Sequence, residues 1–323
     1  MNYRLPYPSA RPQGRFLLYC LMLLQVACSD APATVLTVLQ APSAEIELTT
    51  DTLKVVSLNM AHGRKDSINQ LLISGTTIRS NLADIAAVLT STRANIVALQ
   101  EADAASRWSG NFDHVALLAE QAHFPATAHT AHASSWLFNY GTAILSQTAF
   151  TETLNYTFEP SPPTTNKGFT LAQIVWHPAA TTVPLLLDIM SVHLDFSRQQ
   201  VREKQIAEIT QALAGRDYPI IILGDFNSDW LADELVVRAL ANDNKLKGYR
   251  PSAKGLGTYG DSDKRLDWIL ISDELEFIDY QVLPDVISDH RAVVAEIGLR
   301  PGTDAARPDG NDPITHTKAD RRR

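Results

Sequence analysis

Asp225 and Asn227 follow the most apolar short run of the chain. The run itself, residues 220–223, is too short for a helix and lies between Pro219 and Gly224, so we predict a strand buried on both faces. Side chains two residues apart at a strand end point the same way, so this carboxylate and this amide can meet one ligand. The peptide alone is equally well explained by a turn in which both side chains satisfy backbone groups.

Further acids, amides and histidines occur at the edges of other segments with strand character. Strands are expected at residues 53–59, 95–101 and 185–192, within 265–272, and in a last strand that ends near Leu299. Together with the two residues above, the polar residues at these edges are Asn59, Glu101, His193, Asp225, Asn227, Asp267, Asp289 and His290. One buried polar residue can be a satisfied core group, whereas eight at strand edges indicate a common cleft.

The remaining segments supply the elements that would position these residues. Helices are expected at residues 78–89, 112–122, 197–213 and 235–240, and further strands at 140–146, 169–177 and 276–283. Residues 151–167, which contain three prolines, and the glycine-rich residues 248–263 are expected to be loops. His123, His129 and His132 have spacings that fit no tight metal motif, so we expect them to be exposed in a loop-rich stretch.

The first 28 residues have the layout of a secretory leader, with three arginines, no acid and an apolar segment at residues 16–26. That segment is shorter than the roughly 20 residues that a membrane-spanning helix needs. Ala27-Cys28-Ser29 resembles the lipobox of bacterial lipoproteins, with Gln25 where leucine is usual. We therefore expect an exported periplasmic or outer-membrane lipoprotein of a bacterium, or otherwise a secreted protein, with acylation of Cys28 favoured over plain cleavage or an uncleaved anchor.

The rest of the chain divides by composition into a linker, a domain and a tail. Residues 29–50 are rich in Ala, Pro, Thr and Ser and predict a flexible linker, residues 51–299 a folded domain, and residues 300–323 a disordered polar tail. Cys20 and Cys28 are the only cysteines, and both lie in the leader. The predicted domain therefore has no disulfide, thiol nucleophile or cysteine metal site.

The chain is acidic, with a formal net charge of −8 that becomes −11 once the leader is removed. General affinity for nucleic acid comes mostly from neutralisation of phosphates by Lys and Arg. The charge therefore weighs against a high-affinity nucleic-acid binder, although it leaves room for a local basic groove.

Six motifs resemble, in order, those of the endonuclease/exonuclease/phosphatase superfamily, whose best-known fold is that of deoxyribonuclease I. They are S-L-N at 57–59, L-Q-E at 99–101, V-H-L at 192–194, G-D-F-N at 224–227, L-D-W-I at 266–269 and S-D-H at 288–290. The resemblance covers residues 53–299 and implies an α/β fold, a four-layer sandwich of two packed mixed β-sheets flanked by helices. It also implies a phosphoesterase that depends on Mg²⁺, with Mn²⁺ as a substitute.

Two departures from the family pattern affect phosphate recognition. Thr142 stands where many relatives have asparagine, which would alter a phosphate contact. Asn166-Lys-Gly168 is similar to a lysine-glycine pair of some lipid-cleaving members.

The resemblance also implies roles for the eight strand-edge residues. Glu101, Asn59 and Asp289 would lie at the metal, and a carboxylate such as Glu101 is a hard oxygen ligand that suits Mg²⁺. Asn59 would contact the substrate phosphate as well.

The other five residues would act on water and phosphate. Asp225, held by Asn227, would orient and deprotonate the attacking water. His290, oriented by Asp267, would stabilise the charge of the pentacoordinate phosphorus. His193 would bind phosphoryl oxygens, and Asn227 would also face the substrate.

Three functions remain open from the sequence, all with a phosphoester-bearing ligand. A phosphodiesterase or phosphatase acting on a lipid headgroup or related molecule suits an anchored, acidic, exported domain that meets the membrane through its anchor, and we expect a monomer. An exported nuclease would need a basic cleft, for which the evident residues are Lys54, Arg64, Lys65, Lys167, Arg198 and Arg265. A non-catalytic phosphate binder is disfavoured because every expected acid and histidine is present.

Overall fold

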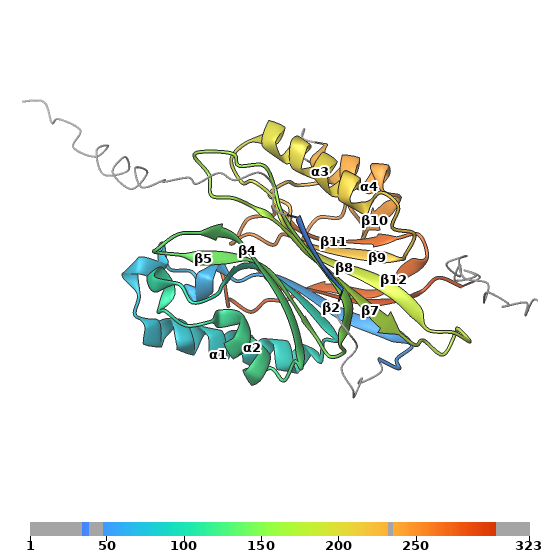
Figure 1. Ribbon diagram of the computed structural model, residues 1–323, viewed down its shortest axis with the longest axis horizontal. Helices are drawn as coiled ribbons and strands as arrows, with labels where there is room; N and C mark the ends of the chain where they lie inside the picture. The colour runs from blue at the N-terminus through green and yellow to red at the C-terminus, as the bar shows by residue number, and fades with distance from the viewer. Residues whose placement is uncertain (1–33, 39–47, 232–234, 302–323) are drawn as a thin grey trace, which may run out of the picture.

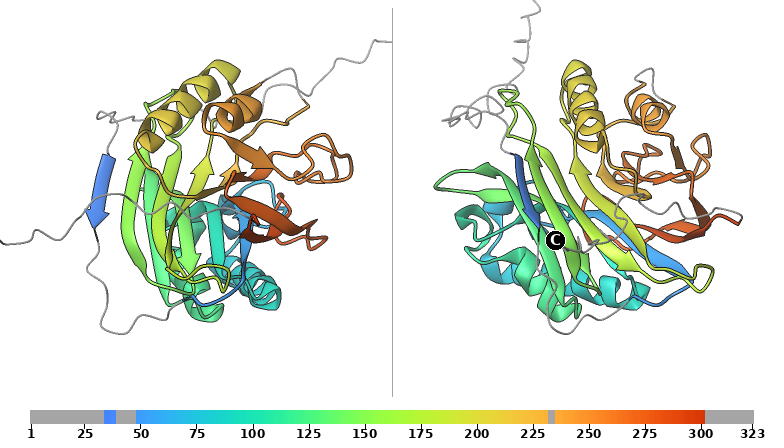
Figure 2. Two further views of the ribbon diagram at one scale, coloured as in Figure 1. Left: turned by 90° about the vertical axis from the view of Figure 1, so that its right-hand side faces the viewer. Right: turned by 45° about the vertical axis from the view of Figure 1, so that its right-hand side comes forward.

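The computed structural model describes residues 34–38, 48–231 and 235–301, so the predicted leader and residues 302–323 of the predicted tail lie outside it. Two β-sheets pack face to face, and helices cover their outer faces (Figures 1 and 2). The fold is therefore the α/β sandwich that the sequence predicts. No helix of the described segments is long and apolar enough to span a bilayer.

One sheet has seven strands among the described residues, in the order β1-β6-β7-β8-β9-β11-β10. Their bounds are Thr34–Val38 (β1), Phe150–Thr157 (β6), Gly168–Trp176 (β7), Leu185–His193 (β8), Ile220–Asp225 (β9), Asp267–Ser272 (β11) and Leu246–Gly248 (β10). Helices α3 (Gln199–Leu213) and α4 (Val236–Asp243) bury Ile206, Ile209 and Leu240 in the cluster on its outer face.

The second sheet, within the part of the chain that the structure describes, has six strands in the order β12-β13-β2-β3-β5-β4. Their bounds are Leu275–Val282 (β12), Val293–Leu299 (β13), Thr52–Asn59 (β2), Ile96–Asp103 (β3), Asn139–Ser146 (β5) and Ala126–Ser134 (β4). Helices α1 (Gly75–Thr92) and α2 (His114–Gln121) cover its outer face through Leu82, Ile85 and Leu118. Short 3-10 turns occupy Ala61–Gly63, Gln70–Leu72 and Arg107–Ser109.

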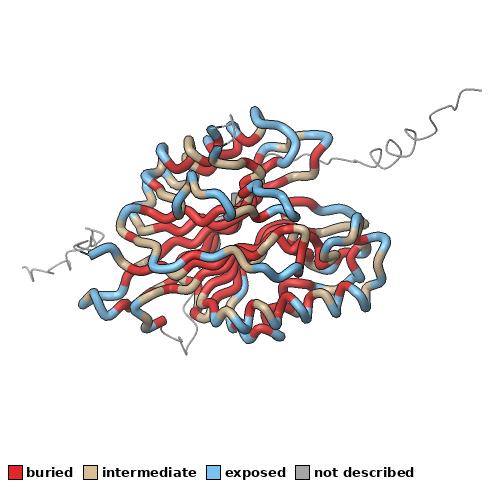
Figure 3. The backbone as a smooth tube through the Cα atoms, turned by 180° about the vertical axis from the view of Figure 1, so that it is seen from behind, coloured by how far each residue is buried: buried red, intermediate tan, exposed pale blue. Residues whose placement is uncertain are grey.

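Because both sheets are covered on both sides, their central strands are apolar on both faces. In β9, Ile221 and Leu223 pack between the sheets, whereas Ile222 packs under the helices. Figure 3 shows the result as a continuous buried interior with exposed residues on the helices and loops. The all-apolar run that predicted β9 is thus a direct consequence of this layering.

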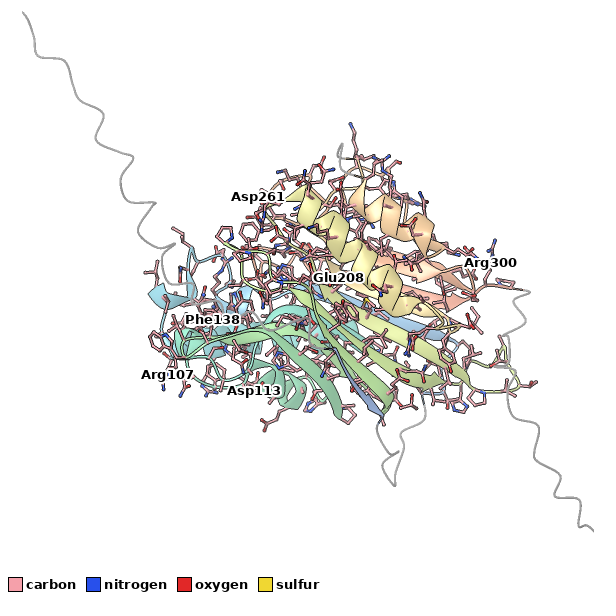
Figure 4. The ribbon with its side chains drawn as sticks, turned by 45° about the horizontal axis from the view of Figure 1, so that its top comes forward. Arg107, Asp113, Phe138, Glu208, Asp261 and Arg300 are labelled. Carbon is pink, nitrogen blue, oxygen red and sulfur yellow. The ribbon has the colours of Figure 1, made fainter. Side chains whose placement is uncertain are left out.

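The strand register brings the predicted polar edges together. Parallel pairing sets Asn59, the last residue of β2, beside Gln100 in β3, and His193 beside Asp225 at the ends of β8 and β9. Antiparallel pairing sets Asp267, the first residue of β11, opposite Asp225. This edge of the sandwich lies at the Phe138 and Asp261 end of Figure 4, and Arg300 lies at the opposite end.

Close strand packing explains one glycine of the central motif. Gly224 has φ +156°, and a Cβ on it would lie 2.0 Å from the carbonyl oxygen of Val192 in β8. Any larger residue would therefore push β9 away from β8 at the point where Asp225 and His193 are paired.

Three segments are more ordered than the sequence predicts. Residues 34–38, inside the predicted linker, form β1 against β6, and β6 (150–157) takes up residues 151–157 of the predicted 151–167 loop. Residues 126–134 form β4, although they consist mainly of Ala, Thr and His and lack the large apolar residues that reveal a strand. Strand pairing across the chain, which no local pattern encodes, stabilises all three.

The prediction that the histidines around β4 are exposed is correct for His123 and wrong for His132. His132 points inward from β4, where its Nε2 lies 2.8 Å from Thr142 Oγ1 and its Nδ1 lies 3.1 Å from Thr157 Oγ1. Burial lowers the pKa of His132 to about 3, so the ring is neutral. His129 is half-buried and contacts the carbonyl oxygen of Ala102.

Candidate active site

Asp225 is the centre of the strand-edge cluster and is 1% exposed. Its Oδ2 accepts a hydrogen bond from Asn59 Nδ2 (3.0 Å), which joins the two sheets, and its Oδ1 accepts one from the backbone N–H of Asn227 (2.9 Å). Two imidazoles face Oδ2, with His193 Nε2 at 3.5 Å and His290 Nε2 at 3.7 Å. Four of the predicted site residues thus surround the predicted base.

His290 forms a buried pair with Asp267, whose Oδ2 lies 2.8 Å from His290 Nδ1. Burial alone would lower the pKa of His290, but the carboxylates of Asp267 and Asp225 raise it to about 10. Burial and the nearby Asp267 carboxylate raise the pKa of Asp225 to about 6, against the opposing attraction of the imidazolium. At neutral pH the arrangement is a carboxylate next to an imidazolium, a base and a cation side by side.

Glu101 stands at an irregularity in the pairing of β3 with β5, with φ 49°. The left-handed backbone changes the direction of the Glu101 side chain from the one that regular strand alternation would give it. Such backbone strain is characteristic of functional positions. Burial opposes ionisation of Glu101, but the positive charges of His62 and Lys167 hold its pKa well below the usual range. Glu101 is therefore a fixed anion at the edge of the cluster.

His193 differs from His290 in its charge. Burial, together with the adjacent Lys167 cation, places the pKa of His193 well below its usual range, so the ring is neutral. Lys167 Nζ lies 3.4 Å from His193 Nδ1 and acts as the donor, which leaves the ring proton on Nε2, the atom facing Asp225.

Asn227, Asp289 and Thr142 lie where the chain order predicts, with partners that the sequence does not reveal. Asn227 has φ 49°, and its Nδ2 donates to the carbonyl oxygen of Leu194 (3.1 Å). The carboxylate of Asp289 is paired with Arg64. Thr142 Oγ1 is buried beside the hydroxyl of Thr170 (2.9 Å). The roles assigned to these residues from the resemblance stay predictions.

Two further side chains lie at the site: Lys167, which the sequence suggested only as a lysine-glycine pair and a basic-cleft candidate, and His62, which was missed. Lys167 is 6% exposed, and burial lowers its pKa while the carboxylates of Glu101 and Asp225 oppose that shift. Its signal was the Asn166-Lys-Gly168 tripeptide. His62, whose Nε2 lies 3.3 Å from Glu101 Oε2, comes three residues after Asn59 in the loop with a glycine exit.

The donor set fits a divalent cation at Glu101. Its ionised carboxylate is the kind of hard ligand that Mg²⁺ takes, and its side chain is 21% exposed, so it reaches the opening of the site. Asp225, Asp267 and His290 also bring ligand atoms within 4.8 Å of one another. We favour Glu101 over that group because the resemblance assigns Asp225 to the attacking water and His290 to the phosphoryl charge. The buried Oδ1 of Asp267 has no hydrogen-bond partner in the described structure, which leaves it available to a water molecule or to substrate.

These geometries agree with comparisons to known proteins. Residues 56–290 match the model of the Endonuclease/Exonuclease/phosphatase family, so the chain belongs to this family. Its members hydrolyse phosphoester bonds and generally depend on a divalent metal. The protein is accordingly a phosphoester hydrolase, as the motifs predict. No curated protein matches the sequence.

Solved structures share the fold at low sequence identity. An endonuclease/exonuclease/phosphatase family protein from Bacteroides thetaiotaomicron has a TM-score of 0.61 at 14% identity, over 79% of this chain and 98% of that one. A mannosyl-6-phosphatase from the same organism has a TM-score of 0.56 at 15% identity, over 76% of this chain and 99% of that one. The catalytic domain of human Nocturnin, solved with a sulfate anion, has a TM-score of 0.56 at 15% identity, over 80% of this chain and 97% of that one. At these identities the likeness is one of fold.

Proposed function

We propose that the protein is a Mg²⁺-dependent phosphoesterase that hydrolyses a phosphodiester or phosphomonoester of a membrane lipid headgroup or a related molecule, by in-line attack of water. The observation that carries this proposal is the carboxylate of Asp225 fixed between Asn59 and Asn227 and facing the protonated His290. Mn²⁺ would substitute for Mg²⁺. Bound at Glu101, the ion would neutralise phosphoryl charge and polarise the phosphorus.

Asp225 would take the proton of the attacking water. Its two hydrogen bonds leave the carboxylate in one orientation, and its pKa of about 6 makes it ionised yet basic at neutral pH. Asn59 therefore sets the direction of the base rather than serving only the metal, because its Oδ1 accepts from the backbone N–H of Ala61 (3.1 Å) and its Nδ2 is on Asp225.

The cationic and N–H groups around Asp225 would meet the phosphoryl oxygens. His290 presents Nε2–H while Asp267 fixes its Nδ1, and the neutral His193 presents Nε2–H while Lys167 fixes its Nδ1. As water adds to phosphorus, negative charge is spread over the equatorial oxygens, and as the bond to the leaving oxygen breaks, its electron pair goes to that oxygen. Fixed donors in a water-poor site stabilise such charge most strongly. Lys167 adds a positive charge directly behind His193.

The lipid substrate is supported by the predicted export signal and lipobox, and by the state of the surface cations. Six basic residues were named for a nuclease cleft. Of these, Arg64 is paired with Asp289, and Lys65 Nζ lies 3.7 Å from Asp84 Oδ2. Arg265 is 3% exposed and stacks on Trp268. Three of the six are therefore engaged within the protein, which weighs against binding of a polyanion, and nuclease activity remains the alternative. Membrane anchoring, an outer-membrane or periplasmic location and the monomeric state remain proposals.

The test measures Mg²⁺-dependent release of phosphorylated headgroup from phospholipid vesicles by the purified protein, with Asp225→Ala as the inactive control and His123→Gln as the surface control. Plasmid DNA, RNA, a sugar phosphate and an inositol phosphate are assayed in parallel. We expect turnover on at least one lipid and none with Asp225→Ala. Digestion of nucleic acid without any lipid turnover would replace the lipid proposal by the nuclease one.

A further inference from the structure

Hydrogen bonds hold the backbone on both sides of His62, although this residue lies in a loop. It lies in the 3-10 turn after β2 with φ 55°, and it is 7% exposed. Asn59 Oδ1 accepts from the backbone N–H of Ala61, and Asn81 Nδ2 donates to the carbonyl oxygen of Gly63 (2.9 Å). Helix α1 and strand β2 thus hold the turn on either side of the histidine.

Asp103 fixes the ring of His62. His62 Nδ1 lies 2.7 Å from Asp103 Oδ2, while Asp103 Oδ1 accepts from Trp108 Nε1 (2.8 Å) and Ser109 Oγ (3.0 Å). The rings of Trp108 and Tyr140 meet the imidazole edge-on at 4.9 and 4.6 Å. The proton on Nδ1 is therefore directed at Asp103, and Nε2 is the atom directed toward the active site.

His62 Nε2 lies 3.3 Å from Glu101 Oε2. The contact has ion-pair distance. Ligand atoms bonded to one ion at about 2.0–2.2 Å lie roughly 2.9–3.6 Å apart, which is the separation seen here. A metal-bound histidine almost always gives its other ring N–H to a carboxylate, as His62 does.

From this geometry we propose that His62 Nε2 and the Glu101 carboxylate bind the same divalent cation, with Asp103 orienting the imidazole. The carboxylates of Asp103 and Glu101 raise the pKa of His62 against the effect of burial, so the ion would displace a proton from Nε2 as it binds. Imidazole ligands suit transition dications, whereas Mg²⁺ prefers oxygen, so His62 would make this centre bind Mn²⁺ in preference to Mg²⁺. The inference rests on the proposed metal-dependent function, to which it adds a nitrogen ligand and a metal preference.

The test uses Mn²⁺ itself as the probe and reads binding instead of activity. Electron spin echo envelope modulation on the Mn²⁺-loaded protein is expected to show coupling to a ¹⁴N nucleus in the wild type and in His123→Gln, and to lose it in His62→Gln. Calorimetric titration is expected to show that His62→Gln raises the Kd for Mn²⁺ by at least about 10-fold and that for Mg²⁺ by less.

Asp103→Asn keeps the imidazole but weakens its orientation, so it is expected to raise the Kd for Mn²⁺ and to leave some ¹⁴N coupling. It also provides a second reading if His62→Gln loses its circular dichroism signature. Coupling that persists in His62→Gln, or an equal loss of affinity for both metals without any ¹⁴N coupling in the wild type, would overturn the assignment. A wild type that turns over phosphoester with Mg²⁺ but shows no ¹⁴N coupling removes only His62, whereas a protein that binds neither metal removes the metal-dependent function as well.

Discussion

Two histidine–aspartate pairs of nearly equal geometry flank the site, and they face carboxylates of opposite character. His290 is held by Asp267 at 2.8 Å, and His62 is held by Asp103 at 2.7 Å. The first faces Asp225 and the second faces Glu101, at 3.7 and 3.3 Å from Nε2. Burial raises the pKa of Asp225 to about 6, whereas the pKa of Glu101 is held below its usual range.

The difference comes from the neighbours of each carboxylate. Asp225 has a second acid, Asp267, across the strand pairing, which disfavours its ionised form. Glu101 has the cation of Lys167 in addition to its histidine, which favours the ionised form. One fold thus sets a proton acceptor and a permanent anion within the same cluster, and the surroundings rather than the residue type separate base from metal ligand.

The largest effect is expected when the base is removed. Asp225→Asn keeps the size of the side chain and its contact with the Asn227 backbone but cannot accept a proton from water, so kcat should fall by about 10²–10⁴-fold or more. The measurement is steady-state hydrolysis at saturating Mg²⁺, with the circular dichroism spectrum as the fold control. If the loss is under about 10-fold, Asp225 is not the base.

Glu101→Gln should instead act through the metal. The neutral amide is a weak ligand, so the Kd for Mg²⁺ should rise by roughly 10–100-fold and the lost activity should return in part at high Mg²⁺. Activity is measured against Mg²⁺ concentration for Glu101→Gln and Asp225→Asn together. Equal rescue of both variants would mean that the two carboxylates have the same role.

Substitutions of Asp267 and Asp103, which orient the two histidines, should also have different effects, one on catalysis and one on metal binding. Asp267→Asn removes the carboxylate that favours the charged form of His290, so kcat should fall by about 10-fold or more, most strongly at alkaline pH. Asp103→Asn should change mainly metal affinity, by about 10-fold. A result in which Asp103→Asn lowers kcat at saturating metal and Asp267→Asn does not would reverse the comparison.

The unsubstituted protein should show the smallest change per step, about 10-fold for each pH unit on either limb of its pH profile. Asp225 has a raised pKa of about 6 and must be ionised to act, so kcat/KM should rise with pH up to about 6 and fall as pH decreases through that value. His290 must be protonated, so activity should fall again as pH rises through about 10. A substrate with a constant charge over this range is required, and a rate that stays flat to pH 4 would contradict the assignment of Asp225.

Local sequence patterns could reveal the strands and helices whose apolar residues are large. The runs in β2, β3, β8 and β9 are short, branched and apolar, and each ends in a polar residue, so both the strands and the candidate site could be predicted from them. Strand β4 could not, because its buried positions include Ala128, Thr130 and His132. Its order comes from pairing with β5 and from hydrogen bonds across the two sheets.

The sequence by itself determined the family, the layered α/β class and the eight polar strand ends, because burial on both faces leaves an apolar run and a family leaves its motifs. Only the tertiary structure decided the direction of Glu101, which depends on the left-handed backbone in β3, and the pairing of His62 with Asp103. It also decided the opposite pKa shifts of Asp225 and Glu101. Charge interactions depend on distance through space, and residues 41 to 166 positions apart, such as His62 and Asp103 or Asn59 and Asp225, become neighbours only when the two sheets pack.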